Sequence, residues 1–377
     1  MTINYVLGNW MKVDLIDLKY RYLDEHKQIL KSINKLLKKG NLILTKEVKT
    51  FEEDICSYTN MKYCLGLNSG TDALMMSLWA LGIKKGDEVI TTPVSFIASV
   101  GAIAHIGARP VFVDVGEDFN IDPKNIEIAI TNKTKAIMPV HWGGRICDME
   151  PIIAISKKFN IPIIEDSAQG MGAYYKNSHS GTFGYISAFS GHPLKNLGAI
   201  GDSGFIVTNN KSIYEKIKLY RNHGLISRDK IGIFGINSRM DSINAEVLSF
   251  RLKKLKSVIK SRNKNVKLYK KYINTNKVFI PHNKKYEINA YVMFLTLCED
   301  RDKLQKYLLD NNIQSMVYYG TPLHLHGPSK ALGYKKGDFP IAENICSKVL
   351  ALPHHQYLSE THIKFVSGKI NSFYKNY

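Results

Sequence analysis

The sequence predicts an α/β protein of two lobes, a large one built on a mostly parallel sheet and a smaller α+β one. Short apolar segments alternate with amphipathic helical segments over the first part of the chain, which is typical of a sheet covered by helices on both faces. At 377 residues the chain exceeds one ordinary domain, and the order of elements changes near residue 250. We therefore expect a large domain over residues 1–250 and a small domain over residues 251–377.

Five apolar segments of the large lobe predict buried strands. They are GDEVITTP (86–93), RPVFVDV (109–115), KAIMPVH (135–141), IPIIEDSA (161–168) and SAFSG (187–191). Helical patterns separate them, at residues 72–81, 97–105, 123–130 and 149–159. Gly82 and Gly107 follow two of these patterns, at positions where a glycine commonly ends a helix.

The small lobe is expected to begin with a basic amphipathic helix from Arg251, whose lysines form a solvated face. Further on, the patterns predict a strand in NAYVMFLTL (289–297), a helix in 301–312 and a strand in IQSMVYYG (313–320). Residues 342–353 and the last stretch of the chain are expected to be helical.

Composition narrows the class of protein. The net charge is 52 minus 33, or +19, but the chain is rich in Lys, Asn and Ile together, so we attribute the charge to composition and expect no nucleic-acid partner. No apolar run reaches about 18 residues, so no membrane span is expected. The amino terminus lacks the order of regions of a signal peptide, which predicts a cytoplasmic protein. Five scattered cysteines without a CxxC pair indicate reduced thiols and no metal site.

The first chemically informative segment is IPIIEDSAQG (161–170). Four apolar residues lead into Glu165 and Asp166 at the carboxyl end of an expected strand, which is where open α/β sheets bind ligands. A carboxylate there can bind a metal, orient a base or pair with a cationic ring. The alternative is an ordinary helix N-cap, a position that Asp and Ser both favour.

The second segment is AFSGHPLKNLGAIGDSG (188–204). Lys195 lies in a Gly/Pro-containing turn just after a buried strand. A lysine in such a place can have a lowered pKa and act as an amine nucleophile that forms Schiff bases. The alternative is an ordinary surface lysine in a loop.

The third segment is LNSGTDALMMSLWALG (67–82), in which Ser69, Gly70, Thr71 and Asp72 open a helix. Glycine and hydroxyl residues at a helix N-terminus can bind a phosphate through backbone N–H groups and the helix dipole. The alternative is an N-cap without a ligand, and no Gly-Lys-Ser/Thr follows to make a Walker sequence.

Together these segments resemble the pyridoxal-phosphate aminotransferases of the DegT/DnrJ/EryC1/StrS family, which aminate nucleotide-linked keto sugars. The resemblance runs from VDLIDLKYRY (13–22) through SGTDAL, VFVDV, NIDP, PVH, IEDSAQ, KNLGAIGDSG, RNHG and NSRMD to LGYKKGDFPIAE (332–343). It implies an aspartate-aminotransferase-like fold, that is, fold type I of the pyridoxal-phosphate enzymes, and pyridoxal 5′-phosphate as cofactor.

The resemblance also implies roles for single residues. Lys195 matches the catalytic lysine that forms a Schiff base with the cofactor, and Asp166 matches the carboxylate paired with its pyridinium nitrogen. Gln169 matches the residue beside the phenolic oxygen, and Phe96 an aromatic that stacks on the ring. The implied phosphate-binding positions are Gly70, Thr71, Ser190 and, from a neighbouring subunit, Asn237, which implies a homodimer with shared active sites.

The turn SGHPLK departs from the family, which usually has an aromatic and a small residue before the lysine. Gly191, His192 and Leu194 therefore put substrate contacts in question, but none of them removes a catalytic group. Four histidines are candidates for substrate contacts: His141, His192, His324 and His326. The alternative for His141, His324 and His326 is a histidine without a role in the site.

The implied reaction moves an amino group from an amino acid, with L-glutamate expected, to a keto carbon of a nucleotide-linked deoxysugar. The VDLIDLK opening and the HLHGPSK segment favour a 3-keto-6-deoxyhexose, while a 4-keto sugar stays open. A sister branch with histidine at the lysine position runs a dehydration, so Lys195 favours transamination over that alternative. A regulator that uses this fold as a sensor is the other class. Products of such enzymes usually supply surface polysaccharides or glycosylated metabolites.

Overall fold

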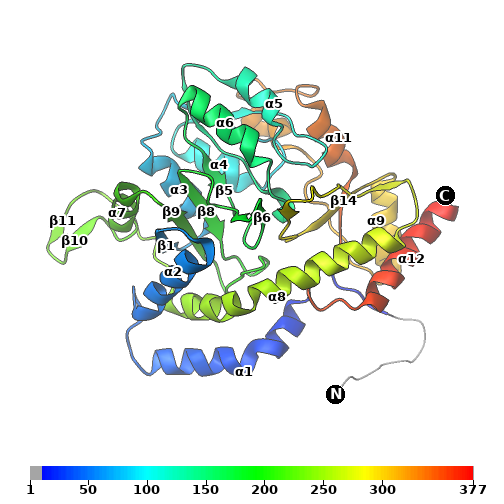
Figure 1. Cartoon of the computed structure of the whole chain (residues 1–377), viewed down its shortest axis with the longest axis horizontal. Coiled ribbons are helices and arrows are strands. Elements are labelled where there is room, and N and C mark those ends of the chain that lie inside the picture. Colours follow the sequence, from blue (N-terminus) through cyan, green and yellow to red (C-terminus); the bar gives the residue numbers. More distant parts are fainter. Residues whose placement is uncertain (1–10, 377) are drawn as a thin grey trace.

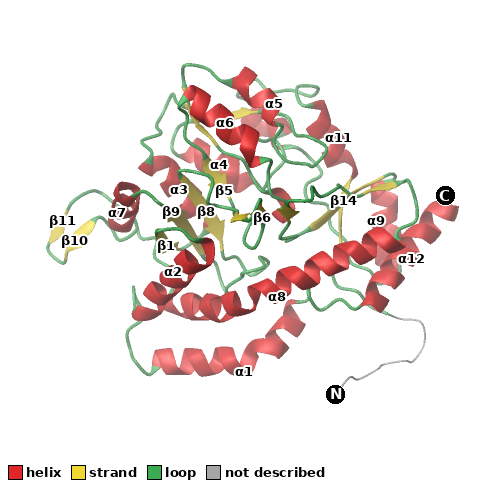
Figure 2. Ribbon diagram, viewed as in Figure 1, coloured by secondary structure: helices red, strands yellow, loops and turns green. Residues whose placement is uncertain are grey.

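The computed structural model describes residues 11–376 (Figure 1). Residues 1–10, which belong to the segment from which no signal peptide is expected, and residue 377 lie outside that range. Strands gather in the middle of the molecule, helices surround them, and the long helix α8 (Ser242–Tyr272) runs beneath both lobes (Figures 1 and 2).

The large lobe is built on two sheets that meet edge to edge. One has the order β1 (Tyr63–Leu67), β9 (Gly204–Thr208), β8 (Ile186–Ser190) and β5 (Ile164–Asp166). The other has the order β3 (Arg109–Phe112), β2 (Glu88–Thr91) and β4 (Thr134–Ile137). Two parallel bridges, Ile137 to Ile163 and Val140 to Asp166, join β4 to β5.

Wherever two of the predicted strands pair with each other, they run parallel. β2 is parallel to β3 and β4, and β5 is parallel to β8. The sequence patterns missed β1 and β9, and β9 runs antiparallel to both of its neighbours. Both missed strands contain a glycine, a residue that usually signals a turn or a loop.

Two apolar cores cover the two faces of these sheets. Helices α3 (Gly70–Ala80), α4 (Ile97–His105) and α7 (Lys211–Tyr220) pack on one face, through side chains such as Leu74, Ile103 and Ile217. Helices α2 (Lys46–Thr59), α6 (Met149–Phe159) and α8 pack on the other, with Phe51 and Leu248 among the buried side chains. The sheet is thus covered on both faces, as the alternating pattern predicted.

The remaining elements of the large lobe are short. The expected helix at 123–130 is α5 (Pro123–Ile126) followed by a 3₁₀ turn (Glu127–Ala129), and a second 3₁₀ turn covers Trp142–Gly144. Strand β6 (Tyr174–Tyr175) pairs with β7 (Ser178–His179) and with β13 (Glu287–Ile288). The hairpin β10 (Leu225–Ser227) and β11 (Lys230–Ile231) projects from the body of the molecule beside α7 (Figure 1).

The small lobe has an antiparallel sheet of β12 (Val278–Phe279), β14 (Phe294–Cys298) and β15 (Val349–Leu352). Helices α9 (Arg301–Asp310) and α12 (Glu360–Asn376) enclose a core with Tyr269 of α8. Two predictions were wrong here. Residues 313–320 form only two isolated bridges instead of a strand, and residues 342–353 divide into the end of helix α11 (Pro340–Lys348) and strand β15. A short helix, α10 (Gly327–Lys330), precedes α11 after a 3₁₀ turn at Leu323–Leu325.

Helix α8 shows why the division between lobes is hard to read from the sequence. It begins at Ser242 and passes without a break through residue 250, the predicted boundary, so that boundary stays a prediction. Most of its lysines are exposed as predicted, but Arg251 and Arg262 are buried. Helix α1 (Leu18–Leu37) runs beside α8 on the lower side of the molecule (Figure 1). Within residues 11–376, no helix has the length and apolarity that a membrane crossing needs.

Candidate active site

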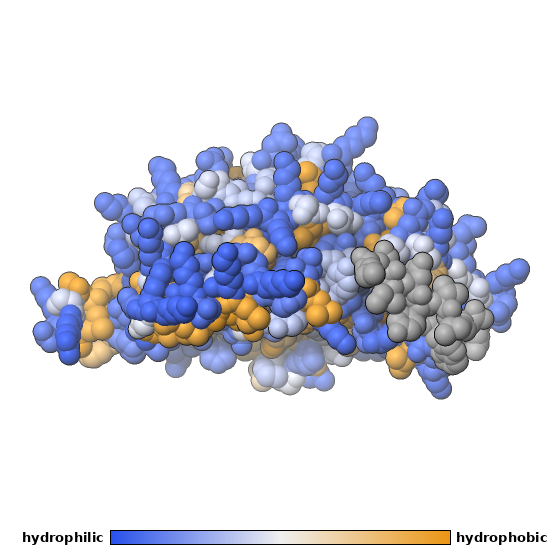
Figure 3. All heavy atoms as spheres, turned by 90° about the horizontal axis from the view of Figure 1, so that it is seen from below, coloured by the Kyte–Doolittle hydropathy of each residue, from blue (hydrophilic) through white to orange (hydrophobic). Residues whose placement is uncertain are grey.

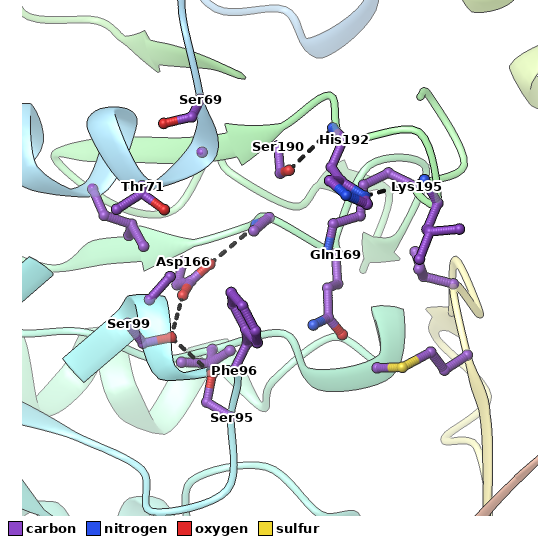
Figure 4. Close-up of a pocket in the computed structure, with 18 of the residues that line it drawn as sticks. Ser69, Thr71, Ser95, Phe96, Ser99, Asp166, Gln169, Ser190, His192 and Lys195 are labelled. Atoms are coloured by element: carbon purple, nitrogen blue, oxygen red, sulfur yellow. Dashed lines mark hydrogen bonds between the residues drawn. The ribbon is translucent and has the colours of Figure 1, made fainter. Parts of the chain in front are cut away.

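A cavity of about 440 Å³ lies at the carboxyl ends of β5 and β8 and the N-terminus of α3. Seven of the eight residues for which the resemblance implied a cofactor-binding role line it: Gly70, Thr71, Phe96, Asp166, Gln169, Ser190 and Lys195. The small lobe and the loop before it contribute Val292, Met293, Tyr318 and Tyr319. Residues far apart in the chain therefore share one site (Figure 4).

Asp166 ends β5 and is buried at the floor of the cavity. Its Oδ2 accepts a 2.6 Å hydrogen bond from the Ser99 hydroxyl, and its Oδ1 accepts one of 3.1 Å from the Ala168 amide. Since the Ser99 proton points at Asp166, the 2.7 Å contact between the Ser95 and Ser99 hydroxyls has Ser95 as the donor (Figure 4). Burial raises the pKa of Asp166, and these hydrogen bonds offset the rise only in part.

The N-terminus of α3 forms the second wall of the cavity. Ser69 is its N-cap, and the Ser69 hydroxyl accepts a 3.0 Å hydrogen bond from the Asp72 amide. Gly70 touches Ser190 so closely that a Cβ added to it would lie 2.8 Å from the Ser190 Cβ. A Cβ on Gly204 would lie 2.3 Å from the Ser69 carbonyl. The glycines therefore allow three segments to converge on one helix N-terminus, which is a favourable site for an anion.

Lys195 follows β8 in a compact turn, in which its amide donates to the His192 carbonyl at 2.8 Å. Its side chain lines the cavity from the side opposite Ser99 and Asp166 (Figure 4). Burial lowers the pKa of Lys195 to about 8, against the opposing effect of the Asp166 charge. More of this amine is therefore neutral, and hence nucleophilic, near neutral pH than in an ordinary lysine.

Gln169 and Phe96 present complementary surfaces to the cavity. The Gln169 Oε1 accepts a 2.6 Å hydrogen bond from the Gly143 amide, which leaves its amide nitrogen to donate to a ligand oxygen. The Phe96 ring is 51% exposed although it stands at the entrance to a helix, and its centroid lies 6.1 Å from that of Tyr319. An aromatic face left open beside a cavity suits a flat ring as ligand.

The structure separates the four candidate histidines. His192 lines the cavity beside Lys195, and its Nδ1 accepts a 3.2 Å hydrogen bond from the Leu194 amide. His141 is fully buried behind the cavity, where its Nδ1 accepts from the Cys147 amide and its Nε2 donates to Glu165 at 3.0 Å. Neither His324, buried 3.1 Å from Glu343, nor the exposed His326 lines the cavity. His141 does not line the cavity either.

Asn237 also lies outside the cavity of its own chain, in an exposed segment next to the β10–β11 hairpin. Its neighbour Ser238 donates a 2.6 Å hydrogen bond to Asp72 of α3. The role implied for Asn237 requires a second subunit and is taken up below.

Sequence reasoning missed Ser95, Ser99, Tyr318 and Tyr319, which all line the cavity. Ser99 lies one helical turn after Ser95 at the start of α4, and this spacing was the one available signal for the pair. The two tyrosines lie in residues 313–320, for which the sequence predicts a strand, so nothing in their pattern indicated a site.

The comparisons with known proteins match nearly the whole chain. The model of the DegT/DnrJ/EryC1/StrS aminotransferase family matches residues 23–371. The chain belongs to this family. It is 38% identical to the "Pleiotropic regulatory protein" of Geobacillus stearothermophilus, over 97% of this chain and all of that one. It is 36% identical to the "dTDP-3-amino-3,6-dideoxy-alpha-D-galactopyranose transaminase" of Aneurinibacillus thermoaerophilus, over 96% and 99% of the two chains.

Solved structures of aminotransferases support the same family assignment. The chain resembles DesV of S. venezuelae, solved in complex with a ketimine intermediate, with a TM-score of 0.93 and 32% identity over 96% of this chain and 98% of that one. The fold is therefore that of the fold type I pyridoxal-phosphate enzymes, and the protein is an aminotransferase. Its cofactor is pyridoxal phosphate, which solved relatives carry in that form or in its amino form.

The cavity of this aminotransferase fits that cofactor. A buried carboxylate with a raised pKa gains from a cationic ring nitrogen opposite it, as Asp166 would. The convergent N-terminus of α3 suits a phosphate, the amine of Lys195 suits an aldehyde, and the open face of Phe96 suits the ring.

Proposed function

We propose that this aminotransferase moves an amino group from L-glutamate to a keto carbon of a nucleotide-linked deoxysugar. The observation that carries the proposal is the meeting of Lys195, Asp166 and the N-terminus of α3 around one cavity. Relatives named as transaminases of dTDP-3-amino sugars support a sugar nucleotide as substrate. Their names support the 3-keto-6-deoxyhexose that the sequence favours, while a 4-keto sugar stays open.

Each residue around the cavity would have its own chemical role in this reaction. When bound, the cofactor supplies an aldehyde that takes up the amino group and a ring that accepts electrons from the reacting carbon. Lys195 would hold that aldehyde and, once a substrate amine replaces it, carry a proton between cofactor and substrate carbon as general base and acid. Asp166, supported by Ser99, would keep the ring nitrogen protonated, and the Gln169 amide would donate to the phenolic oxygen.

The phosphate would be held by backbone N–H and hydroxyl groups of Gly70, Thr71 and Ser190, and Phe96 would cover the ring. His192 is the histidine we propose for substrate contact. Its Nδ1 is an acceptor, so its neutral form has an Nε2–H donor for a sugar or phosphate oxygen. The net charge of +19 suits a substrate that carries a diphosphate.

We also propose a homodimer in which Asn237 of each subunit completes the site of the other. Apolar side chains are exposed on the projecting hairpin and the residues after it: Ile226, Ile231, Phe234 and Ile236. Phe234 is 96% exposed, and Figure 3 shows apolar atoms gathered at that end of the molecule and along the underside. A second copy that covers this surface would bury the apolar patch.

The test is an absorbance spectrum of the purified protein, recorded before and after L-glutamate is added. Loss of the band of the lysine-bound cofactor and growth of that of its amino form is the expected result. Nucleotide-linked 3-keto and 4-keto deoxysugars are then supplied to the amino form, and the sugar that restores the first band and yields an amine is the substrate. A deoxygenated product without an amine would instead indicate a dehydratase.

Regulation is a second candidate, because the Geobacillus relative is named a regulatory protein. A regulator needs no turnover. Bound cofactor whose spectrum glutamate and other amino acids leave unchanged would favour this candidate over the enzyme.

A further inference from the structure

The loop that carries Lys195 is compact but leaves several carbonyl groups without backbone partners. It is closed by the hydrogen bond from the Lys195 amide and by a 2.7 Å bond from the Ala199 amide to the Gly191 carbonyl. A Cβ on Gly198 would lie 2.5 Å from the Pro193 carbonyl oxygen, so the turn has no room to relax. Within residues 11–376, no backbone N–H donates to the carbonyls of Lys195, Asn196, Gly198 or Ala199.

Two buried arginines from distant helices donate to these four carbonyls. Arg21 of α1 donates through Nη1 to the Lys195 carbonyl at 3.3 Å and through Nη2 to the Asn196 carbonyl at 3.2 Å. Arg251 of α8 donates through Nη1 to the Gly198 carbonyl and, at 3.1 Å, to the Ala199 carbonyl. The planar fork of a guanidinium can serve two neighbouring carbonyls at once, which an ammonium cannot do in a fixed geometry.

Glu25, one helical turn after Arg21, holds the two arginines together. Its Oε2 accepts from Nε of Arg251 at 2.8 Å, lies 2.8 Å from Nη2 of Arg251 and lies 3.7 Å from Nε of Arg21. All three side chains are 5–8% exposed. Burial and the like charge of Arg251 lower the pKa of Arg21 to about 10, so the cluster is costly to keep charged inside the protein.

We infer that Arg21, Glu25 and Arg251 form a triad that positions Lys195 for reaction with the cofactor aldehyde. A buried ion cluster gives little stability compared with apolar packing, so stability alone is a poor reason for its presence. Its donors converge instead on the backbone of the residue whose amine reacts and on three of the four positions after it. Holding the Lys195 carbonyl fixes the peptide plane and hence the direction of the side chain. The inference rests on the role proposed for Lys195.

The triad links a helix from the amino-terminal part of the chain to the active site. Helix α1 buries Ile29 and Leu36 but adds no residue to the two cores that cover the large sheet, and it supplies two of the three triad members. It therefore reaches the active site through Arg21, even though Arg21 does not line the cavity.

The experiment compares two ligands on the full-length protein freed of cofactor. Pyridoxal phosphate binds through its ring and phosphate and is then captured covalently by Lys195, whereas 4′-deoxypyridoxine phosphate has no aldehyde and only binds. Arg21→Lys keeps the charge but loses the fork. The rate of covalent capture, followed by absorbance, is expected to fall about 10- to 100-fold, the range expected when reacting groups are misplaced. The affinity for the deoxy analogue should stay unchanged.

Arg221→Lys is the matched control. Arg221 is 5% exposed, pairs with Glu52 at 2.6 Å and donates to the Gly66 carbonyl at 2.7 Å, but touches no residue of the Lys195 loop. It should affect thermal stability without slowing capture. If Arg21→Lys does not fold, Arg21→Gln, a neutral donor that needs no counter-charge, is measured in the same way.

Capture at the wild-type rate in the Arg21 variant would overturn the inference, as would an equal loss for both ligands, because that result means general damage to the site. Absence of covalent capture in the wild-type protein would instead contradict the role proposed for Lys195 itself.

Discussion

Burial in one cavity shifts the pKa values of Lys195 and Asp166 in opposite directions. Burial lowers the pKa of the amine and raises that of the carboxyl, and each charge partly restores the other. Both shifts favour the neutral forms when no ligand is present. A cofactor with an aldehyde and a cationic ring nitrogen makes use of both groups, so the cost of burying them is offset on binding.

The pH dependence of Lys195 follows from these signs. In the cofactor-free protein, its reactivity toward a small amine-specific reagent, measured by peptide mass spectrometry, should rise with pH through a midpoint of about 8 and then level off. Asp166→Asn removes the charge that stabilises the ammonium form, so the midpoint should move to lower pH. Reactivity that keeps rising beyond pH 10, as for an ordinary lysine, would contradict the effect of burial.

At the scale of elements, the site depends on how closely β9 approaches the start of α3. Gly204 begins β9 directly behind the Ser69 carbonyl, and Gly70 begins α3 against Ser190. The sequence pointed to the SGTDAL helix start as an anion site. It gave no sign that a glycine from a strand more than a hundred residues later makes room for it, because β9 itself was missed.

Gly204→Ala tests this approach. The new methyl group would meet the Ser69 backbone, so we expect a loss of about 1–3 kcal/mol in the free energy of unfolding and weaker binding of 4′-deoxypyridoxine phosphate. Gly368→Ala in α12 is the control, since a Cβ there meets nothing within 4 Å. Denaturant unfolding and an equilibrium titration measure the two effects. If Gly204→Ala changes neither the free energy of unfolding nor the affinity for the analogue, the contact between β9 and the Ser69 backbone is not tight.

For the whole molecule, the question is whether one chain holds a complete site. The cavity contains seven of the eight positions expected to bind the cofactor, and the eighth, Asn237, lies outside it beside an exposed apolar hairpin. This arrangement is what a site shared between subunits requires. Both features fit the homodimer proposed above.

Subunit complementation tests the shared site. Lys195→Ala and Asn237→Ala proteins should each be nearly inactive. If sites are shared, a mixed dimer has one site with both changes and one site with neither. Unfolding and refolding the two together in equal amounts should therefore restore about a quarter of the wild-type activity. A mixture no more active than its parts would contradict shared sites, and sedimentation would report whether dimers had formed.

The sequence by itself determined the chemistry. Asp166 and Lys195 were singled out because apolar strand patterns lead into them, and a strand end in an α/β sheet is a ligand site wherever the rest of the chain lies. The roles expected for Gln169 and Ser190 followed only from the resemblance to the family. The alternation of strands and helices likewise predicted a sheet covered on both faces, since each pattern records which side of its element is buried.

Only the tertiary structure decided which side chains support that chemistry. Arg251 has the same sequence surroundings as the exposed lysines that follow it, and Arg21 lies in a helix with many polar residues, yet both are buried against the Lys195 loop. His141, which looked close to the pocket, instead pairs with Glu165 behind it. The physical reason is that a periodic pattern reports burial along one element, whereas a hydrogen bond between separate elements depends on how those elements pack.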